Sequence, residues 1–302
     1  MTRLIRLECI YDEEVYWKRV HRNLAWLGDT PEEQQERQKR FSDVTVGVAG
    51  CGGIGGACAV RLARMGIRHI KVADPDVFEW TNVNRQMGAS KANLGKNKAE
   101  VVGQMVYELA GDVTVEIFPE GITKDNAREF VNGCDLVLDQ MDFYLLGERY
   151  ALHRAFRESL RTKYILSAWC IGWGTSLFKW THEGMSLEEY FDIPEDTPLK
   201  GDVIIRLLSK FMPNKPPFPS IETIYDWFVN KHTVPLYAAS PPIAEAAVIP
   251  QVALVVAGLE DAPFVTKLPA APDCWVFDSM TLEGRFLRYE GGVHHAIDCH
   301  EG

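Results

Sequence analysis

Basic and amide side chains gather in a short stretch that follows an acidic residue. The acid is Asp74, and the side chains after it are Asn82, Arg85, Gln86 and Lys98. Arginine and lysine stabilise the negative charge that develops on phosphoryl oxygens, so this grouping is typical of a site that cuts a phosphoanhydride. An acid in this place can hold the two hydroxyls of a ribose. Together these residues predict a site for a nucleoside triphosphate.

A glycine-rich turn lies before this group, and its glycines are Gly50, Gly52, Gly53 and Gly55. A β-branched run (Val44–Val48) precedes the turn, and a helical pattern (Ile54–Met65) and a second strand (His69–Ala73) follow it. This order is the dinucleotide-binding fingerprint, in which glycines let the backbone approach a phosphate and the helix N-terminus offers free N–H groups. By itself the fingerprint predicts only that a nucleotide binds here.

An NAD(P)-dependent oxidoreductase on the same Rossmann core is an alternative hypothesis. It would account for the glycines and Asp74. It would leave Arg85, Lys98 and Asp142 without a task, because a nicotinamide enzyme needs no further charged cluster on this loop. A non-catalytic nucleotide-sensing module is a further alternative. We therefore favour ATP as the ligand.

From Arg19 to Trp180, the order and spacing of these motifs resemble the ThiF-type activating enzymes, relatives of molybdopterin-synthase adenylyltransferase and the ubiquitin-activating enzymes. The resemblance implies an adenylyltransferase that uses ATP and Mg²⁺ to activate a substrate carboxylate as an acyl-adenylate, with release of pyrophosphate. It also implies that the glycine turn holds phosphates, that Asp74 holds the ribose, and that Asn82, Arg85, Gln86 and Lys98 surround the triphosphate.

Two further residues receive their roles from the resemblance. Asp142, the second acid of the run Asp139-Gln-Met-Asp, is expected to hold Mg²⁺; family members usually place asparagine next, where this chain has Phe143. Arg22 is expected to reach the ATP site of the partner subunit in a homodimer. The alternatives are that Asp142 caps a helix and that Arg22 lies on a solvated basic helix face.

The chain has seven cysteines, at positions 9, 51, 58, 134, 170, 274 and 299. An odd number without framework spacing favours reduced thiols and a cytoplasmic protein. No C-x-x-C pair occurs, although many members of the resembling family carry two such pairs as a zinc site, so we predict no zinc. Ubiquitin-type relatives carry a catalytic cysteine in the crossover region, but none lies between Cys170 and Cys274. With Cys170 interpreted as a buried thiol, no thioester step is expected.

The resemblance leaves the identity of the substrate carboxylate open. Without zinc or a crossover cysteine, we expect a peptide or small protein, as in the adenylating enzymes of ribosomally made natural products. The alternative is a cyclase similar to the tRNA threonylcarbamoyladenosine dehydratases, which share the run Asn82-x-Asn-Arg-Gln86. A net charge of −10 and the lack of a basic cluster favour the peptide over tRNA.

Strands and helices alternate through the middle of the chain. Strands are predicted at Val113–Phe118, Leu136–Asp139, Tyr164–Ala168 and Thr175–Trp180, and helices at Asn93–Glu108, Lys124–Val131 and Leu145–Leu160. Such alternation predicts an α/β, Rossmann-like fold whose mostly parallel sheet has helices on both faces and ligands at the carboxyl ends of its strands. Residues 44–180 form the predicted ATP-binding adenylation core.

The remaining residues flank this core. Residues 1–43 are predicted to form a strand (Leu4–Ile10) and a helical arm (Asp12–Leu27, Pro31–Arg40), and residues 181–302 an irregular crossover and substrate region with a closing helix-strand segment. The predicted helices there are Gly201–Phe211, Ser220–Asn230 and Pro241–Gly258, and the closing antiparallel pair is Trp275–Phe277 with Arg285–Tyr289.

Two further segments bear on metals and membranes. Histidines and a cysteine crowd into the tail Gly291–His300, where a metal site is possible but a mobile tail is the favoured interpretation. The apolar stretch Ala244–Leu259 is interrupted by Glu245, Pro250 and Gln251, so no membrane span is expected. The N-terminus lacks the features of a secretory signal.

Overall fold

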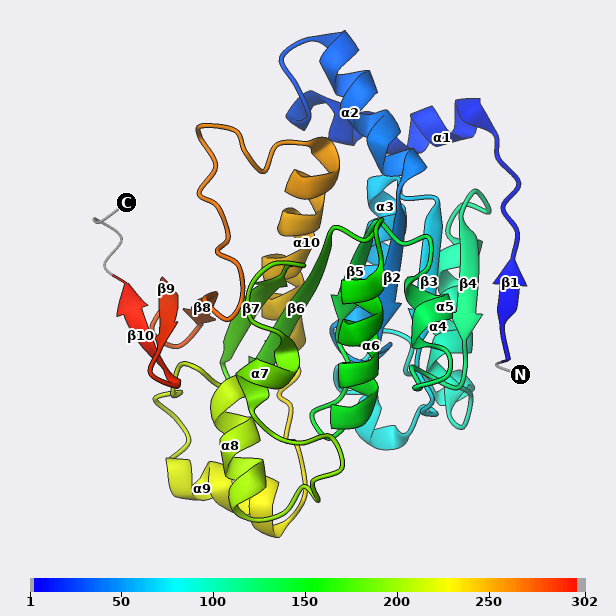
Figure 1. Cartoon of the computed structure of the whole chain (residues 1–302). Helices are drawn as coiled ribbons and strands as arrows, with labels where there is room; N and C mark the ends of the chain where they lie inside the picture. The colour runs from blue at the N-terminus through cyan, green and yellow to red at the C-terminus, as the bar shows by residue number, and fades with distance from the viewer. Residues whose placement is uncertain (1–2, 298–302) are drawn as a thin grey trace.

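The computed structural model describes residues 3–297. One mixed sheet of ten strands has helices on both faces (Figure 1). The strands are β1 (Ile5–Leu7), β2 (Thr45–Ala49), β3 (His69–Ala73), β4 (Thr114–Phe118), β5 (Leu136–Asp139), β6 (Tyr164–Ile171), β7 (Gly174–Trp180), β8 (Cys274–Asp278), β9 (Glu283–Glu290) and β10 (Val293–Ile297). The predicted Rossmann-like α/β class is confirmed.

The longer helices cover this sheet, and shorter turns of helix connect them. The α-helices are α1 (Glu13–Val20), α2 (Pro31–Asp43), α3 (Gly55–Met65), α4 (Lys98–Glu108), α5 (Ala127–Val131), α6 (Leu146–Glu158), α7 (Leu187–Phe191), α8 (Asp202–Phe211), α9 (Ile221–Tyr225) and α10 (Ser240–Ala257). Three short 3₁₀ helices, η1 (His21–Trp26), η2 (Trp80–Asn82) and η3 (Lys91–Asn93), and one π-helical turn, η4 (Asp226–Asn230), complete the described helical elements.

Five neighbouring strands, in the order β4-β3-β2-β5-β6, run parallel. The chain moves from β2 through β3 to β4 on one side and from β5 to β6 on the other. Connections therefore leave β2 and β5 in opposite directions, which makes their carboxyl ends a topological switch point, where ligands bind in sheets of this kind. The other strands pair antiparallel, β1 on β4 and β7 to β10 beyond β6.

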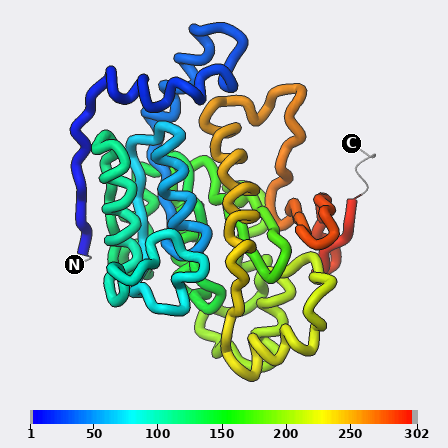
Figure 2. Tube along the Cα trace, turned by 180° about the vertical axis from the view of Figure 1, so that it is seen from behind, coloured from blue at the N-terminus to red at the C-terminus, as the bar shows by residue number. Residues whose placement is uncertain are grey.

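Apolar side chains form two cores, one on each face of the sheet. Ala49 and Val137 belong to the core beneath α5, α6, α7 and α8. Val48 and Leu138 belong to the core beneath α3, α4 and α10. Adjacent residues of a strand face opposite sides, so the nearly continuous apolar runs of β2 and β5 supply both cores. Figure 2 shows the second face, with α10 (orange) beside α3 and with α4 on the far side of α3.

Lys98 lies at the first position of α4 because the chain before it cannot be helical. The predicted helix from Asn93 begins only at Lys98, since Gly95 has a φ of +76° and Asn97 is extended. The Asn97 side chain accepts the N–H of Glu100 and so caps α4. This cap places the Lys98 side chain at the carboxyl edge of the sheet rather than on the solvent face of a longer helix.

The C-terminal segment is more regular than expected. The predicted antiparallel pair is confirmed as β8 and β9, and Val293–Ile297 forms a further strand, β10, on β9. The prediction of a mobile tail is therefore wrong for these residues, which pair along the whole strand. His294 Nε2 lies 2.9 Å from the carbonyl oxygen of Pro272, and residues 3–297 contain no cluster of potential metal ligands. Cys299 and His300 lie outside the described residues.

Helix α10 owes its apolar composition to burial against the sheet. By length and composition alone it could cross a membrane. It packs instead on β6 and β7 and against α2 and α3, with Val248 and Val252 fully buried. Pro250 lies inside the helix.

The N-terminal arm, which consists of α1, η1 and α2, lies at the amino ends of the parallel strands (Figure 1). An ion pair anchors it to the core. Arg19 Nε donates to Asp112 Oδ2 at 2.7 Å, and Arg19 Nη1 donates to the carbonyl oxygen of Ala63 at 2.7 Å. Asp112 is only 1% exposed, so its carboxylate depends on this guanidinium for charge compensation.

We predict that Arg19→Met lowers the free energy of unfolding by about 3 kcal/mol, because it leaves a buried carboxylate without a counter-charge. Lys39→Met, at an exposed position of the same arm, is the matched control and should change it by less than about 0.5 kcal/mol. Urea denaturation measures both values. The double variant Arg19→Met, Asp112→Asn should recover part of the loss, and equal effects of the two single variants would contradict the anchoring role.

Candidate active site

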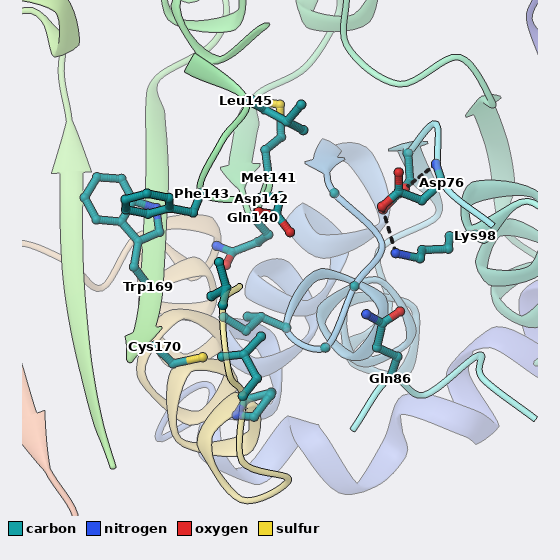
Figure 3. Close-up of a pocket in the computed structure, with 18 of the residues that line it drawn as sticks. Asp76, Gln86, Lys98, Gln140, Met141, Asp142, Phe143, Leu145, Trp169 and Cys170 are labelled. Carbon is teal, nitrogen blue, oxygen red and sulfur yellow. Dashed lines mark hydrogen bonds and ion pairs between the residues drawn. The ribbon is translucent and has the colours of Figure 1, made fainter. Parts of the chain in front are cut away.

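A cavity of about 330 Å³ opens at the carboxyl ends of β2, β3, β5 and β6 (Figure 3). Most residues predicted for the site line it, and they come from the glycine turn after β2, the loop after β3, the start of α4 and the loop after β5. They are Gly50, Gly52, Gly53, Asp74, Arg85, Gln86, Lys98 and Asp142. The structure thus brings Arg85, Lys98 and Asp142 into one cavity.

The glycine turn is shaped by close backbone contacts. Gly50 has a φ of +95°, and a Cβ there would lie 2.3 Å from the carbonyl oxygen of Gln140. A Cβ on Gly55 would lie 1.9 Å from the carbonyl oxygen of Gly50. At Gly52 the nearest atom to an added Cβ is Gln86 Nε2, at 3.7 Å, so the backbone is open to the cavity. The turn therefore leaves room for a phosphate beside the N-terminus of α3.

Asp74 is buried and ties the two loops of the site together. Its Oδ2 accepts the N–H of Cys51 at 2.7 Å, and its Oδ1 accepts the N–H of Asp76 at 2.9 Å. Burial raises the pKa of the Asp74 carboxyl, while the nearby Lys98 lowers it. Asn97 Nδ2 donates to the carbonyl oxygens of Asp74 and Pro119 and holds this loop against α4.

Lys98 is paired with an acid that is not among the predicted site residues. Its Nζ lies 2.9 Å from Asp76 Oδ2, and its side chain is only 9% exposed (Figure 3). Asp76 also lines the cavity. From sequence, an acid beside Pro75 is interpreted as a turn former; its place two residues after Asp74, on the same loop, is the signal that could have identified it.

Arg85 and Gln86 present polar groups to the cavity from the loop after η2. Arg85 Nη1 donates to the carbonyl oxygen of Thr81 and to Asn84 Oδ1, each at 2.9 Å. Burial lowers the pKa of Arg85, an effect that the nearby Cys170 and Asp142 oppose. Within residues 3–297, Arg85 Nε and Gln86 Oε1 are buried without a hydrogen-bond partner. These atoms are therefore available to a ligand.

Gly55, Asn82 and Arg22 do not line the cavity. Gly55 begins α3 behind the turn. Asn82 is buried, and its Oδ1 accepts the N–H of Glu79 at 3.0 Å, which fixes the loop that carries Arg85 and Gln86. Arg22 is exposed in η1, at the amino ends of the strands and far from this cavity in the same chain.

A buried ion pair supports the loop that carries Asp142. Asp139 and Arg149 are both 0% exposed, and Arg149 Nε lies 2.9 Å from Asp139 Oδ2. Arg149 Nη2 donates to the carbonyl oxygen of Met141 at 2.6 Å, and His153 Nε2 lies 3.2 Å from Asp139 Oδ2. The helix-cap alternative for Asp142 is wrong, because α6 begins at Leu146 without a side-chain cap.

The other half of the cavity is apolar and was not predicted. Trp169, Phe211 and Phe228 line it, from β6, α8 and η4. Cys170 lies here as a partly exposed residue, and desolvation of its thiol raises the pKa of Cys170 to about 12. No local sequence pattern joins these residues, since they come from three elements far apart in the chain.

The chain is similar to a known protein family and to several characterised proteins. A family model described as the ThiF family matches residues 20–288. The chain is 35% identical over 103 residues to the tRNA threonylcarbamoyladenosine dehydratase of Escherichia coli strain K12, which is 34% of this chain and 38% of that protein. It is 35% identical over 124 residues to the sulfur carrier protein adenylyltransferase of Thermus thermophilus, which is 41% of this chain and 44% of that protein. The chain thus matches less than half the length of these relatives.

The fold is also similar to the crystal structure of E. coli MccB with ATP. The TM-score is 0.60 at 18% identity, over 91% of this chain and 72% of that chain. A further structure of the same protein contains MccA. At 18% identity, this likeness shows a shared fold alone.

We predict that the free energy of unfolding falls as the pH drops through about 6.5, in part because of His153. Burial lowers the pKa of His153 in the folded protein and outweighs the opposing effect of Asp139, and Arg149 lowers it further. The unfolded chain binds a proton near the ordinary value of 6.5, so below that pH it holds more protons than the folded state and stability falls.

His153→Gln should flatten this dependence by up to about 1.4 kcal/mol per pH unit, the contribution of one proton. Denaturation curves at a series of pH values measure the slope. Exposed His232→Gln is the matched control and should leave it unchanged. Identical slopes for the wild type and His153→Gln would show that His153 does not titrate on unfolding.

Proposed function

The chain belongs to the ThiF family, and on that basis we propose that it is an adenylyltransferase that activates a substrate carboxylate with ATP and Mg²⁺. One observation carries the proposal: Arg85, Lys98, Asp142 and the open backbone of the glycine turn line a single cavity at the switch point of the sheet. A nicotinamide cofactor would make no use of these three charged side chains.

In the proposed reaction, an oxygen of the substrate carboxylate attacks the α-phosphorus of ATP. A carboxylate–phosphorus bond forms, the bond from the α-phosphorus to the bridging oxygen breaks, and pyrophosphate leaves with that oxygen. The acyl group is then bonded to AMP, which is a far better leaving group than oxide. The enzyme's task is to align the two reactants and to stabilise the charge on the phosphoryl oxygens.

Parts of the polar half of the cavity suit the phosphates and the ribose of ATP. The glycine turn and the N-terminus of α3 suit phosphate oxygens, because the backbone at Gly52 is open to the cavity. Asp74 suits the ribose hydroxyls, since each carboxylate oxygen accepts one backbone N–H and has capacity for another donor. Arg85 and Lys98 suit the charge that develops on the phosphoryl oxygens.

Asp142 fits the role of a magnesium ligand. Its carboxylate is exposed at the cavity and forms no ion pair among the described residues. Mg²⁺ in nucleotide sites is usually bound through one or two carboxylates together with substrate phosphates, so a single acid is sufficient. A bound Mg²⁺ would neutralise charge on the phosphates. The buried Asp139–Arg149 pair holds the loop on which Asp142 lies.

We propose that the substrate carboxylate belongs to a peptide or small protein. The T. thermophilus relative is named for a sulfur carrier protein, and MccB is found with MccA. The net charge of −10 opposes binding of a polyanion such as tRNA. The similarity to the E. coli dehydratase favours tRNA as the alternative substrate. We propose neither a zinc site nor a thioester step.

We predict that Arg85→Ala lowers the rate of ATP-dependent AMP release by about 10²–10³-fold, because it removes a cation from the reacting phosphates. The assay uses labelled ATP with Mg²⁺ and, in separate reactions, a peptide library or total tRNA. Exposed Arg64→Ala is the matched control and should keep full activity. Unchanged activity in Arg85→Ala, or tight binding of NADH without binding of ATP, would contradict the proposal. AMP release with tRNA alone would favour the dehydratase-like alternative.

We also propose that the protein is a homodimer in which Arg22 reaches the active site of the partner subunit. This proposal has a test of its own. If Arg22 acts across the interface, Arg22→Ala and Asp142→Asn should each be inactive, but a mixture re-formed from both should regain about a quarter of the wild-type rate. Half of the dimers are then mixed, and each mixed dimer has one site without either change. No recovery in the mixture, at a confirmed dimer mass, would show that Arg22 does not act across the interface.

A further inference from the structure

The cavity continues past the glycine turn, on the side away from Asp76 and Lys98, into a second half (Figure 3). We call it the acyl pocket and define it by Trp169, Cys170, Phe211, Phe228 and Leu236. Trp169, Phe211 and Phe228 line it, so its wall is aromatic, and they are 5%, 5% and 2% exposed because they also belong to the apolar core. The Trp169 and Phe211 rings lie 4.2 Å apart between centroids. Such a wall attracts an apolar group and disfavours a charged one.

Polar atoms at the entrance of the acyl pocket have no partner in the folded chain. Within the described part of the chain, both amide atoms of Gln140 and Nε1 of Trp169 are buried without a hydrogen bond. A buried donor or acceptor left without a partner costs about 1–3 kcal/mol, so such atoms are normally satisfied by a ligand or water. Gln140 offers a donor and an acceptor side by side, and their complement is an amide group.

The order of these features across the cavity sets the order of groups in the substrate. In Figure 3, Asp142 and Lys98 lie on one side, Trp169 and Cys170 lie on the other, and Gln140 lies between them. A substrate whose carboxylate reaches the nucleotide side therefore meets Gln140 next and the aromatic wall last. The last residue of a peptide bears a carboxylate, an amide nitrogen and a side chain on one carbon, so it can present all three groups to these parts of the cavity at once.

We propose that the activated group is the C-terminal carboxylate of a peptide whose last residue has an apolar side chain, held by Gln140 at its amide and by the acyl pocket at its side chain. This inference rests on the proposed function. A side-chain carboxylate of aspartate or glutamate fits less well, because one or two methylenes separate it from the backbone amides, which would then enter the apolar half. A C-terminal glycine would leave the acyl pocket empty.

The test measures ATP–pyrophosphate exchange with N-acetylated tripeptides that differ only in the last residue. Leucine or phenylalanine should exceed glycine in kcat/KM by roughly 10–100-fold, the usual effect of an apolar side chain in a fitted pocket. An amidated C-terminus should be inert. A peptide with an internal glutamate and an amidated C-terminus tests the side-chain carboxylate directly.

Two variants connect this selectivity to the acyl pocket. Leu236→Ser, in a partly exposed segment, should reduce the preference for leucine over glycine by several-fold without changing the affinity for MgATP. Gln140→Met should lower kcat/KM for the acetylated peptides but not for 4-methylpentanoate, which has the same carboxylate and side chain without the amide. Exposed Tyr237→Ser, one residue away, is the matched control.

The outcomes separate this inference from the proposed function. Equal rates of ATP–pyrophosphate exchange with the leucine, glycine and glutamate peptides overturn the inference. They support an adenylyltransferase of broad substrate specificity. Exchange with none of the peptides also overturns it, and AMP release with tRNA then decides whether the adenylyltransferase assignment stands. The preference for leucine, lost in Leu236→Ser and kept in Tyr237→Ser, supports the inference.

Discussion

The architecture depends on how the chain leaves the carboxyl ends of β2 and β5. These strands are neighbours, yet the chain leaves their carboxyl ends toward opposite sides of the sheet, so no connection covers the edge between them. The glycine turn after β2 fills part of this edge only because Gly50 lies against the backbone after β5. Any side chain at Gly50 would push the two loops apart. The same contact that closes the fold therefore sets the shape of the cavity.

A buried charge pair holds the second of these loops in place. Asp139 and Arg149 lie in the apolar layer under the cavity, where a lone charge would be very costly. They compensate each other, and Arg149 also contacts the carbonyl oxygen of Met141 and packs its guanidinium 4.9 Å from the centroid of the Phe211 ring. One side chain thus contacts both the loop that carries Asp142 and the aromatic wall, so the two halves of the cavity share one support.

The sequence predicted the features that a run of consecutive residues determines. Strand, glycine turn, helix and Asp74 form one continuous pattern, and the fold class and the polar half of the cavity follow from it. Asp76 was missed because an acid beside proline has an ordinary role in turns. Trp169, Phe211 and Phe228 were missed because only tertiary packing brings them together, and β10 was missed because its histidines give no apolar alternation. The roles of Arg22 and Asp142 were inferred from the family resemblance, which suggests what a residue does but not where its side chain lies.

The two ends of the described chain close the two ends of the sheet. β1 pairs with β4, and β10 pairs with β9, so each outermost strand comes from a terminal segment. Trimming either segment would uncover a longer strand with a row of free N–H and C=O groups, including the eight residues of β9. Such an open edge recruits other strands and promotes aggregation. Tags and truncations at either terminus thus bear on solubility, although neither β1 nor β10 lines the cavity.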